Sequence, residues 1–158
     1  MAIQTKGKKF EDKFKEDFKK SFPGGTIDRL YDQVSGYKAI SNISDFIGYN
    51  YPLIFYLECK SHKGNTFPLE NLTQYDKLVK KVGIHGVRAG VVIWYIEKDR
   101  VIYVPINTIT KMKQDNKKSV NIRTIDEDGY KYYEIPSVKK RVYMDSDYSV
   151  LKDTEEGD

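Results

Sequence analysis

The chain has 158 residues, of which 39% are hydrophobic and 32% are charged. These values suit one soluble domain with one good core. No apolar run approaches the ~20 residues of a membrane span, and the Lys-rich start lacks the apolar core of a signal peptide. We therefore expect no membrane span and no export signal. The single cysteine, Cys59, excludes an internal disulfide and fits a reducing cytoplasm.

The net charge of +4 is unevenly distributed. Residues 145–158 hold six acids against Lys152, a net charge of −5, which leaves +9 on residues 1–144. A basic body favours a polyanionic partner, although many basic proteins bind none. We expect residues 1–144 to form a single folded domain and residues 145–158 to form an acidic, disordered tail.

The first predicted element is a helix over Lys6–Lys20. Three phenylalanines recur at every fourth residue and form an apolar stripe: Phe10, Phe14 and Phe18. The Pro and glycines of residues 22–25 end the helix. Glu11 lies next to the stripe, where an acid is more often a solvated flank than a ligand.

A first strand is predicted at Thr26–Tyr31, followed by a loop at Gln33–Asn42. Arg29 in this strand has two interpretations. It contacts a phosphate group of a polyanionic partner, or it pairs with an acid such as Asp32.

The stretch from Asp45 to Lys60 reads D-F-I-G-Y-N-Y-P-L-I-F-Y-L-E-C-K. Asn50 and Pro52 interrupt two aromatic and β-branched runs, which predicts a hairpin that turns at residues 50–53. In a symmetric turn, paired residue numbers sum to 103, so Asp45 lies opposite Glu58. Cross-strand carboxylates about 5 Å apart repel each other. This pair therefore needs a compensating cation.

Alternation along the second strand places Glu58 and Lys60 on one face. The opposite face is apolar and predicted to be core: Leu53, Phe55, Leu57 and Cys59. Two carboxylates can hold Mg²⁺, and a lysine beside them can orient a water or offset charge on a phosphate. Glu-x-Lys alone is common on strand surfaces, and its register with Asp45 is what favours a catalytic site.

After Lys60 a polar loop contains His62 and Lys63, which either touch a DNA backbone or are ordinary exposed residues. A helix is predicted over Leu69–Val82. Gln74 falls at the edge of its apolar stripe. Gln74 either positions the attacking water or lies on the surface.

The C-terminal half of the chain is predicted to be mostly β-structure. Ala89–Ile96 is a continuous apolar run, typical of a strand covered on both faces. It is followed by a hairpin strand at Val101–Val104 and a short helix at Pro105–Lys113. Two further strands flank Asp128-Gly129, a strong hairpin signal: Val120–Ile125 and Tyr130–Ile135.

A basic cluster follows these strands and is a candidate DNA contact: Lys139, Lys140 and Arg141. The order of predicted elements is helix, three strands, helix, strand. That order is typical of an α/β architecture with a mixed sheet, here with a C-terminal β extension.

Three segments resemble RecU-type Holliday junction resolvases, particularly shorter phage-type members. They are G-K-K-F-E near the start, I-S-D-F-I-G-Y, and F-Y-L-E-C-K-S-H-K-G-N-T-F-P-L-E-N-L. The resemblance runs from about Gly7 to Trp94. That family belongs to the PD-(D/E)XK nucleases, so the resemblance implies a restriction-endonuclease-like core.

The resemblance also implies roles for residues. Asp45 and Glu58 would bind Mg²⁺, with Mn²⁺ as a substitute, and the Cys59 carbonyl and Glu11 would assist. Lys60 would act in catalysis with Gln74. Two departures stand out. Ile43 occupies a position where bacterial relatives carry Thr, and Gln74 lies closer to Asn71 than the corresponding Gln does there.

The implied function is Mg²⁺-dependent cleavage of four-way DNA junctions by a homodimer. It would take place in the cytoplasm, that of a bacterial host if the gene is a phage gene. Three alternatives remain open at this point. They are a restriction- or repair-type nuclease on the same fold, a branched-DNA-binding protein with little cleavage, and an RNA nuclease.

Overall fold

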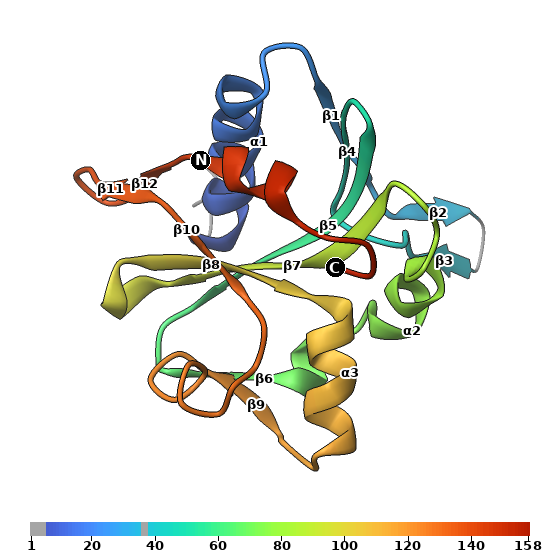
Figure 1. The fold of residues 1–158 in the computed structure, drawn as a ribbon. Helices are drawn as coiled ribbons and strands as arrows, with labels where there is room; N and C mark the ends of the chain where they lie inside the picture. The colour runs from blue at the N-terminus through green and yellow to red at the C-terminus, as the bar shows by residue number, and fades with distance from the viewer. Residues whose placement is uncertain (1–5, 36–37) are drawn as a thin grey trace.

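The computed structural model describes residues 6–35 and 38–158. Its centre is a six-stranded sheet in the order β1-β4-β5-β7-β8-β10 (Figure 1). The strands are β1 (Thr26–Arg29), β4 (Phe46–Asn50), β5 (Leu53–His62), β7 (Val87–Tyr95), β8 (Arg100–Pro105) and β10 (Tyr133–Ile135). β5 and β7 are parallel, and the other neighbours are antiparallel. The predicted α/β fold with a mixed sheet is confirmed.

One face of the sheet is covered by α1 (Lys6–Ser21) and by the 3-10 helix η4 (Tyr148–Asp153) (Figure 1). The predicted phenylalanine stripe is buried, together with Phe22. A Cβ on Gly48 would lie 2.8 Å from the Phe18 ring. Glycine at this position therefore lets α1 pack directly onto β4.

The opposite face carries α3 (Ile106–Gln114) and a two-stranded sheet of β6 (Thr66–Pro68) and β9 (Ser119–Asn121). β7 separates two cores, because its side chains alternate between them. Val92 and Trp94 pack under α1, whereas Val91, Ile93 and Tyr95 pack under α3. This arrangement explains the unbroken apolar run in β7. The 3-10 turn η3 (Ile96–Lys98) connects β7 to β8.

The β4–β5 hairpin has the predicted register. Phe46 pairs with Leu57, and Asn50 pairs with Leu53 at the turn. The four side chains predicted for the core, Leu53, Phe55, Leu57 and Cys59, are all buried under α1. No helix in the described part of the chain is long and apolar enough to cross a membrane.

The predicted helix over residues 69–82 is wrong, because it is broken into three short pieces. They are η1 (Leu69–Asn71), α2 (Tyr75–Leu78) and η2 (Val79–Lys81). The Leu69 amide donates to the Lys118 carbonyl at 2.9 Å, which ties the start of the segment to another loop. Leu72 then leaves the helical region with ψ of 74°. The apolar residues of the stripe still pack into the α3-side core.

The predicted hairpin around Asp128-Gly129 is also wrong. β9 pairs with β6, and β10 pairs with β8, so the two strands do not pair with each other. The connecting residues form helical turns instead, in which the Asp128 amide donates to the Thr124 carbonyl at 2.8 Å. Gly129, with φ of +74°, completes this turn.

Residues 33–42, predicted as a loop, contain a two-stranded antiparallel ribbon. It is formed by β2 (Gln33–Ser35) and β3 (Lys38–Ile40). Outside the ribbon, the Asn42 amide donates to an Asp32 carboxylate oxygen at 2.8 Å. Asp32 is therefore engaged with the base of the ribbon.

The prediction of a disordered tail at residues 145–158 is wrong. The predicted boundary cuts through β12 (Met144–Ser146), which pairs with β11 (Ser137–Lys139). Tyr148 and Leu151 are buried in the core under α1. Buried Arg88 donates to the Thr154 hydroxyl and carbonyl at 3.0 and 3.1 Å. Apolar anchors and a buried cation thus hold an acidic segment against a basic body.

Truncating Leu151 to Ala should destabilise the whole protein if the segment belongs to the fold. Leu151 is completely buried, and large-to-small core changes of this kind cost about 3 kcal/mol. Denaturant unfolding would measure the loss. The neighbouring, exposed Lys152→Ala is the matched control and should stay within about 0.5 kcal/mol of wild type. Equal stability of the two variants would show that η4 does not contribute to the core.

Candidate functional site

The candidate site lies where β4 and β5 separate. Their ladder ends at the pair Phe46–Leu57, whereas β5 continues beside β7 as far as the pair His62–Tyr95. Residues 58–62 of β5 therefore have a strand on one side only. Asp45 stands one residue beyond the ladder, and its Oδ2 accepts a hydrogen bond from the Cys59 amide at 2.9 Å. The predicted juxtaposition of Asp45 and Glu58 is present.

Glu58 is a buried acid without a full set of partners. Its residue is only 2% exposed, and its Oε1 has no hydrogen-bond partner in the described structure. The Lys60 Nζ lies 3.6 Å from its Oε2, and the Lys60 side chain is 30% exposed. Burial and the neighbouring Asp45 raise the pKa of Glu58 to about 8, and Lys60 only partly opposes this rise.

This raised pKa predicts how stability depends on pH. Below about pH 4.5, Glu58 is protonated in both folded and unfolded chains, so it carries no charge penalty. As the pH rises towards 8, the Glu58 carboxyl ionises freely only in the unfolded chain, so the free energy of unfolding falls. Glu58→Gln should remove this loss, raising the free energy of unfolding at pH 8 by about 4 kcal/mol and Tm by roughly 8–16 °C, with no gain near pH 4.5.

Thermal melts of wild type and Glu58→Gln across this pH range, without divalent metal, would check the expectation. Glu70→Gln removes an exposed carboxylate and serves as the control. If the plots of Tm against pH for wild type and Glu58→Gln ran parallel from pH 4.5 to 9, they would contradict a raised pKa of Glu58.

Glu11 and Arg29 form the wall next to the two carboxylates. Arg29 Nη2 forms a hydrogen-bonded ion pair with Glu11, and its Nη1 lies 3.8 Å from Asp12. Burial and the charge of Asp45 raise the pKa of Glu11, while Arg29 and Lys60 lower it. Glu11 is thus within the electrostatic field of the site. Of the two interpretations of Arg29, pairing with an acid is the one observed, and the acid is Glu11 rather than Asp32.

Cys59 presents its backbone, rather than its thiol, to the site. The side chain is buried under α1, and burial raises the pKa of the thiol well above its ordinary value. The Cys59 amide points to Asp45, away from β7. Within a strand, the N–H and C=O of one residue point to the same side. The Cys59 carbonyl therefore faces the same opening as the carboxylates.

Two of the predicted DNA contacts continue the strand from the site. His62 ends β5, and its ring lies edge-on to Phe67 and Tyr95, with ring centroids 6.0 and 6.1 Å apart. Lys63 follows in the exposed loop. Both lie within three residues of Lys60.

The structure does not connect the other predicted residues to the site. Gln74 precedes α2, and within the described residues its side chain makes no hydrogen bond to the carboxylates or to Lys60. The basic cluster lies at the exposed turn between β11 and β12. There Lys139 pairs with Asp99 at 2.6 Å and Lys140 with Asp145 at 3.8 Å, while Arg141 is exposed.

The groups at the site that could bind a metal ion are two carboxylates and a backbone oxygen. No three carboxylate, imidazole or thiolate groups come together as a metal-holding cluster in residues 6–35 and 38–158. A cation here would need Asp45, Glu58, a backbone oxygen and water. This composition matches the habits of Mg²⁺, which keeps several waters and uses one or two carboxylates.

Comparisons with known proteins give the family and a similar fold. The family model described as Recombination protein U, RecU, matches residues 8–143. The chain belongs to the RecU family. No curated protein matches it. Among solved structures it is similar to Hjc, a Holliday junction resolvase from Archaeoglobus fulgidus, with 18% identity and a TM-score of 0.50. The similarity covers 65% of this chain and 78% of the archaeal chain, and it supports a shared fold.

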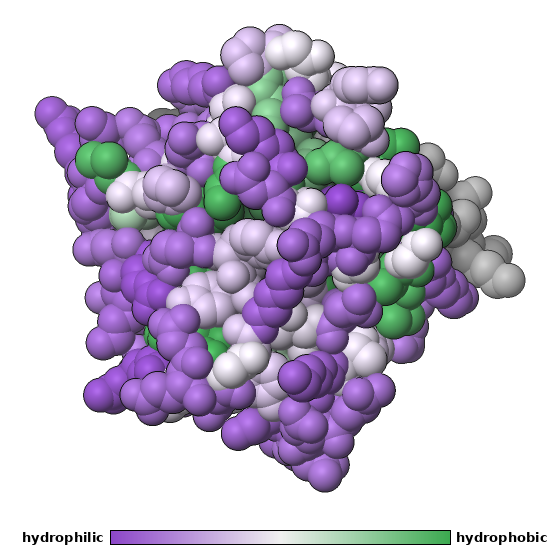
Figure 2. All heavy atoms as spheres, in the orientation of Figure 1, coloured by the Kyte–Doolittle hydropathy of each residue, from purple (hydrophilic) through white to green (hydrophobic). Residues whose placement is uncertain are grey.

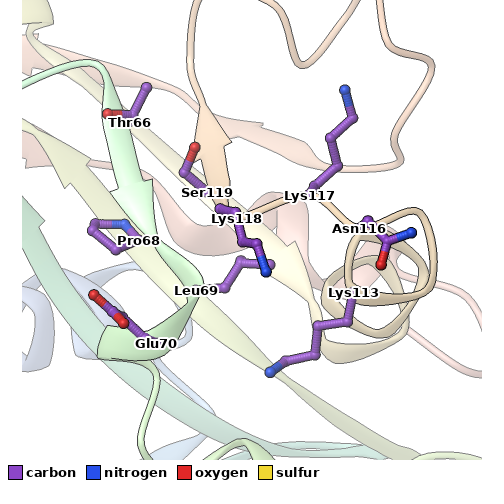
Figure 3. A pocket seen from close by; sticks show the side chains of 9 residues that line it. All are labelled: Thr66, Pro68, Leu69, Glu70, Lys113, Asn116, Lys117, Lys118 and Ser119. Carbon is purple, nitrogen blue, oxygen red and sulfur yellow. The ribbon is translucent and has the colours of Figure 1, made fainter.

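One feature of this RecU-family chain was missed in the sequence. A pocket of about 580 Å³ lies between the β6–η1 segment and the end of α3 (Figure 3). Three lysines line it: Lys113, Lys117 and Lys118. The lysine-rich stretch K-M-K-Q-D-N-K-K was a signal that could have found it.

Proposed function

We propose that this protein is a divalent-metal-dependent DNA endonuclease that resolves four-way junctions by hydrolysing phosphodiester bonds. The observation that carries the proposal is Glu58, a buried carboxylate beside Asp45 with an unpartnered oxygen. Family membership and the fold shared with the archaeal Holliday junction resolvase support the choice of substrate. An arrangement this unfavourable for an isolated protein is typical of a functional site.

Asp45, Glu58 and the Cys59 carbonyl would hold the metal, with Glu11 nearby to bind its water shell. The residues fit a cation, because it would satisfy Glu58 Oε1 and relieve the repulsion that raises the Glu58 pKa. Mg²⁺ is expected, with Mn²⁺ as a substitute. When bound, the ion supplies Lewis-acid polarisation of the phosphate and lowers the pKa of a bound water.

Lys60 is the proposed catalytic cation. Its Nζ lies beside Glu58 and remains partly exposed, so it can reach a substrate phosphate. There it would orient the attacking water and stabilise the negative charge that grows on the phosphoryl oxygens. Arg29 stays paired with Glu11 in the free protein and would contact an adjacent phosphate. Gln74 remains a weaker candidate for positioning water.

The DNA surface would include His62 and Lys63 beside the site and the cluster Lys139, Lys140 and Arg141 at the β11–β12 turn. Symmetric cleavage of two strands needs two active sites, so the proposal includes a two-fold homodimer. The enzyme would act where recombining DNA is found, in the cytoplasm.

A nicking assay tests the proposal. Four-way junction, linear duplex, flap and RNA substrates would be incubated with and without Mg²⁺. Preferred, symmetric cutting of the junction that requires Mg²⁺ is the expected result. Equal cutting of linear duplex would indicate a restriction- or repair-type nuclease, and cutting of RNA alone would indicate an RNA nuclease. Junction binding without cutting would indicate a branched-DNA-binding protein.

A further inference from the structure

The pocket at the end of α3 is basic and has a fixed shape. Its lining combines the three lysines with polar side chains and one acid: Thr66, Glu70, Asn116 and Ser119. In the close view, the Lys113 and Lys118 side chains extend into the space between α3 and the η1 segment, whereas Lys117 extends away (Figure 3). Lys117 lies 3.9 Å from Asp128. Lys113 and Lys118 are therefore the cations available to a ligand.

The backbone on both sides of the pocket is fixed by hydrogen bonds. Asn116 has φ of +59° after the end of α3, and the Lys117 amide donates back to the Met112 carbonyl at 2.9 Å. This is a helix-ending turn that Asn tolerates well. It directs Lys118 towards η1, where the Lys118 carbonyl accepts from the Leu69 amide at 2.9 Å. The backbone around the pocket therefore needs little reorganisation when a ligand binds.

The two cations differ in their own contacts. The Lys118 ammonium makes no hydrogen bond or ion pair with any other part of the described chain, and its residue is exposed. The Lys113 Nζ lies 4.4 Å from the centre of the Tyr75 ring, which is a cation–π contact. The surface over α3 and the β6–β9 pair is largely hydrophilic (Figure 2). Such a surface favours an anion over an apolar partner.

The pocket lies on the same side of the sheet as the catalytic side chains. Because side chains alternate along β5, those of Glu58, Lys60 and His62 lie on the face of the sheet that carries β6. Thr66, in the pocket wall, is six residues after Lys60 in the sequence. An extended chain spans at most about 3.5 Å per residue, so their Cα atoms are within about 21 Å of each other. B-DNA rises 3.4 Å per base pair, so this reach corresponds to about six base pairs.

We propose that Lys113 and Lys118 bind backbone phosphate of the duplex arm being cleaved, up to about six base pairs from the scissile phosphate. This inference rests on the proposed nuclease function and adds a second contact to it. Glu70 also lines the pocket, and its negative charge weakens the hold on the phosphate. The contact is sequence-independent, because it involves phosphate rather than base edges.

Salt-dependent titration of a four-way junction tests the proposal. The double variant Lys113→Gln, Lys118→Gln should bind about 10-fold more weakly, since each exposed ion pair contributes up to about 1 kcal/mol. Its plot of log affinity against log salt should be less steep by about 2. The single-turnover cleavage rate at saturating protein should not change. The control is a second double variant, Lys19→Gln with Lys152→Gln, which removes two exposed lysines from the α1 side. This control should keep the wild-type slope.

Two further measurements guard against a folding defect. Lys118→Gln alone should give half of the slope change, with an unchanged Tm. Glu70→Gln should increase affinity, because it removes a negative charge from the pocket. Shortening the cleaved arm stepwise should make wild type and double variant bind equally once the contacted phosphate is removed, at an arm length of about six base pairs or less.

Several results would overturn the inference. One is a double variant with the slope and affinity of the control. Another is an unchanged or lower affinity for Glu70→Gln. A third is thermal protection by inorganic phosphate that the double variant loses while its DNA binding is unchanged, since this would indicate a site for a small anion. In each case wild type would still bind and cleave the junction, whereas a wild type that binds no DNA would refute the proposed function itself.

Discussion

Asp45→Asn or Glu58→Gln is expected to reduce Mg²⁺-supported junction cleavage by about 1000-fold or more. Each change removes one of the two carboxylates at the end of the β4–β5 ladder. The metal's contribution to the transition state is several kcal/mol, and each 1.36 kcal/mol is tenfold in rate. Single-turnover cleavage of a labelled junction measures the loss.

Binding separates loss of chemistry from loss of fold. Both variants should bind junction in Ca²⁺ or EDTA with near-wild-type affinity. Asp28→Asn changes an exposed carboxylate on β1 and should cleave normally. Glu58→Gln should be inactive and yet more stable at pH 8, an exchange of stability for function that is common at active sites. Substantial Mg²⁺-supported cleavage by either variant would remove the metal-site assignment.

The parts of the fold that were predicted correctly depend on short-range signals. The β4–β5 register follows from one turn at residues 50–53 and from alternation, both visible within the segment. The α1 stripe and the buried run of β7 are similarly local patterns. The candidate pair Asp45 and Glu58 could be found for the same reason, because a single hairpin brings it together.

Two of the errors, the hairpin at Asp128-Gly129 and the helix over residues 69–82, have a common physical cause, which is bonding between distant segments. Asp128-Gly129 does form a turn, but β9 pairs with β6, which lies 51–55 residues earlier. The start of the 69–82 segment is tied to Lys118 through the Leu69 amide, and the segment leaves the helical region at Leu72. No local pattern in either segment reports these partners.

The acidic C-terminal segment shows how composition can mislead. Its charge predicted disorder, but its two large apolar residues, Tyr148 and Leu151, anchor it in the core. Its partners are supplied from elsewhere: Arg88 for Thr154, and Lys13 for Asp145 at 2.6 Å. The segment's net charge is therefore balanced by the body of the protein, and a count within the segment alone does not show this.

The wall of the site was only partly predictable. Glu11 was a candidate because the family resemblance implied it, and Arg29 was a candidate phosphate contact. Their ion pair joins α1 to β1, and nothing in either segment specifies it. The pair has a consequence for the mechanism, because Arg29 restrains Glu11 from acting as a free metal ligand in the unbound protein.

Lys60→Ala is expected to lower the single-turnover cleavage rate by roughly 100-fold, the scale observed when one transition-state donor is removed. The Lys60 ammonium lies 3.6 Å from Glu58 and partly opposes the rise in the Glu58 pKa. Its loss should therefore raise that pKa further and move the rise of activity with pH to higher pH. Lys63→Ala, in the adjacent exposed loop, is the control and should affect binding more than rate.

A structural role for Lys60 makes a different prediction. Because the Lys60 side chain is partly exposed, Lys60→Ala should melt within a few degrees of wild type. Lys60→Arg keeps the charge but changes its geometry, so it should recover only part of the rate. Global unfolding of Lys60→Ala, or a cleavage rate and pH profile equal to those of wild type, would contradict the catalytic assignment. A shifted pH profile in a folded protein is the result that a purely structural lysine would not produce.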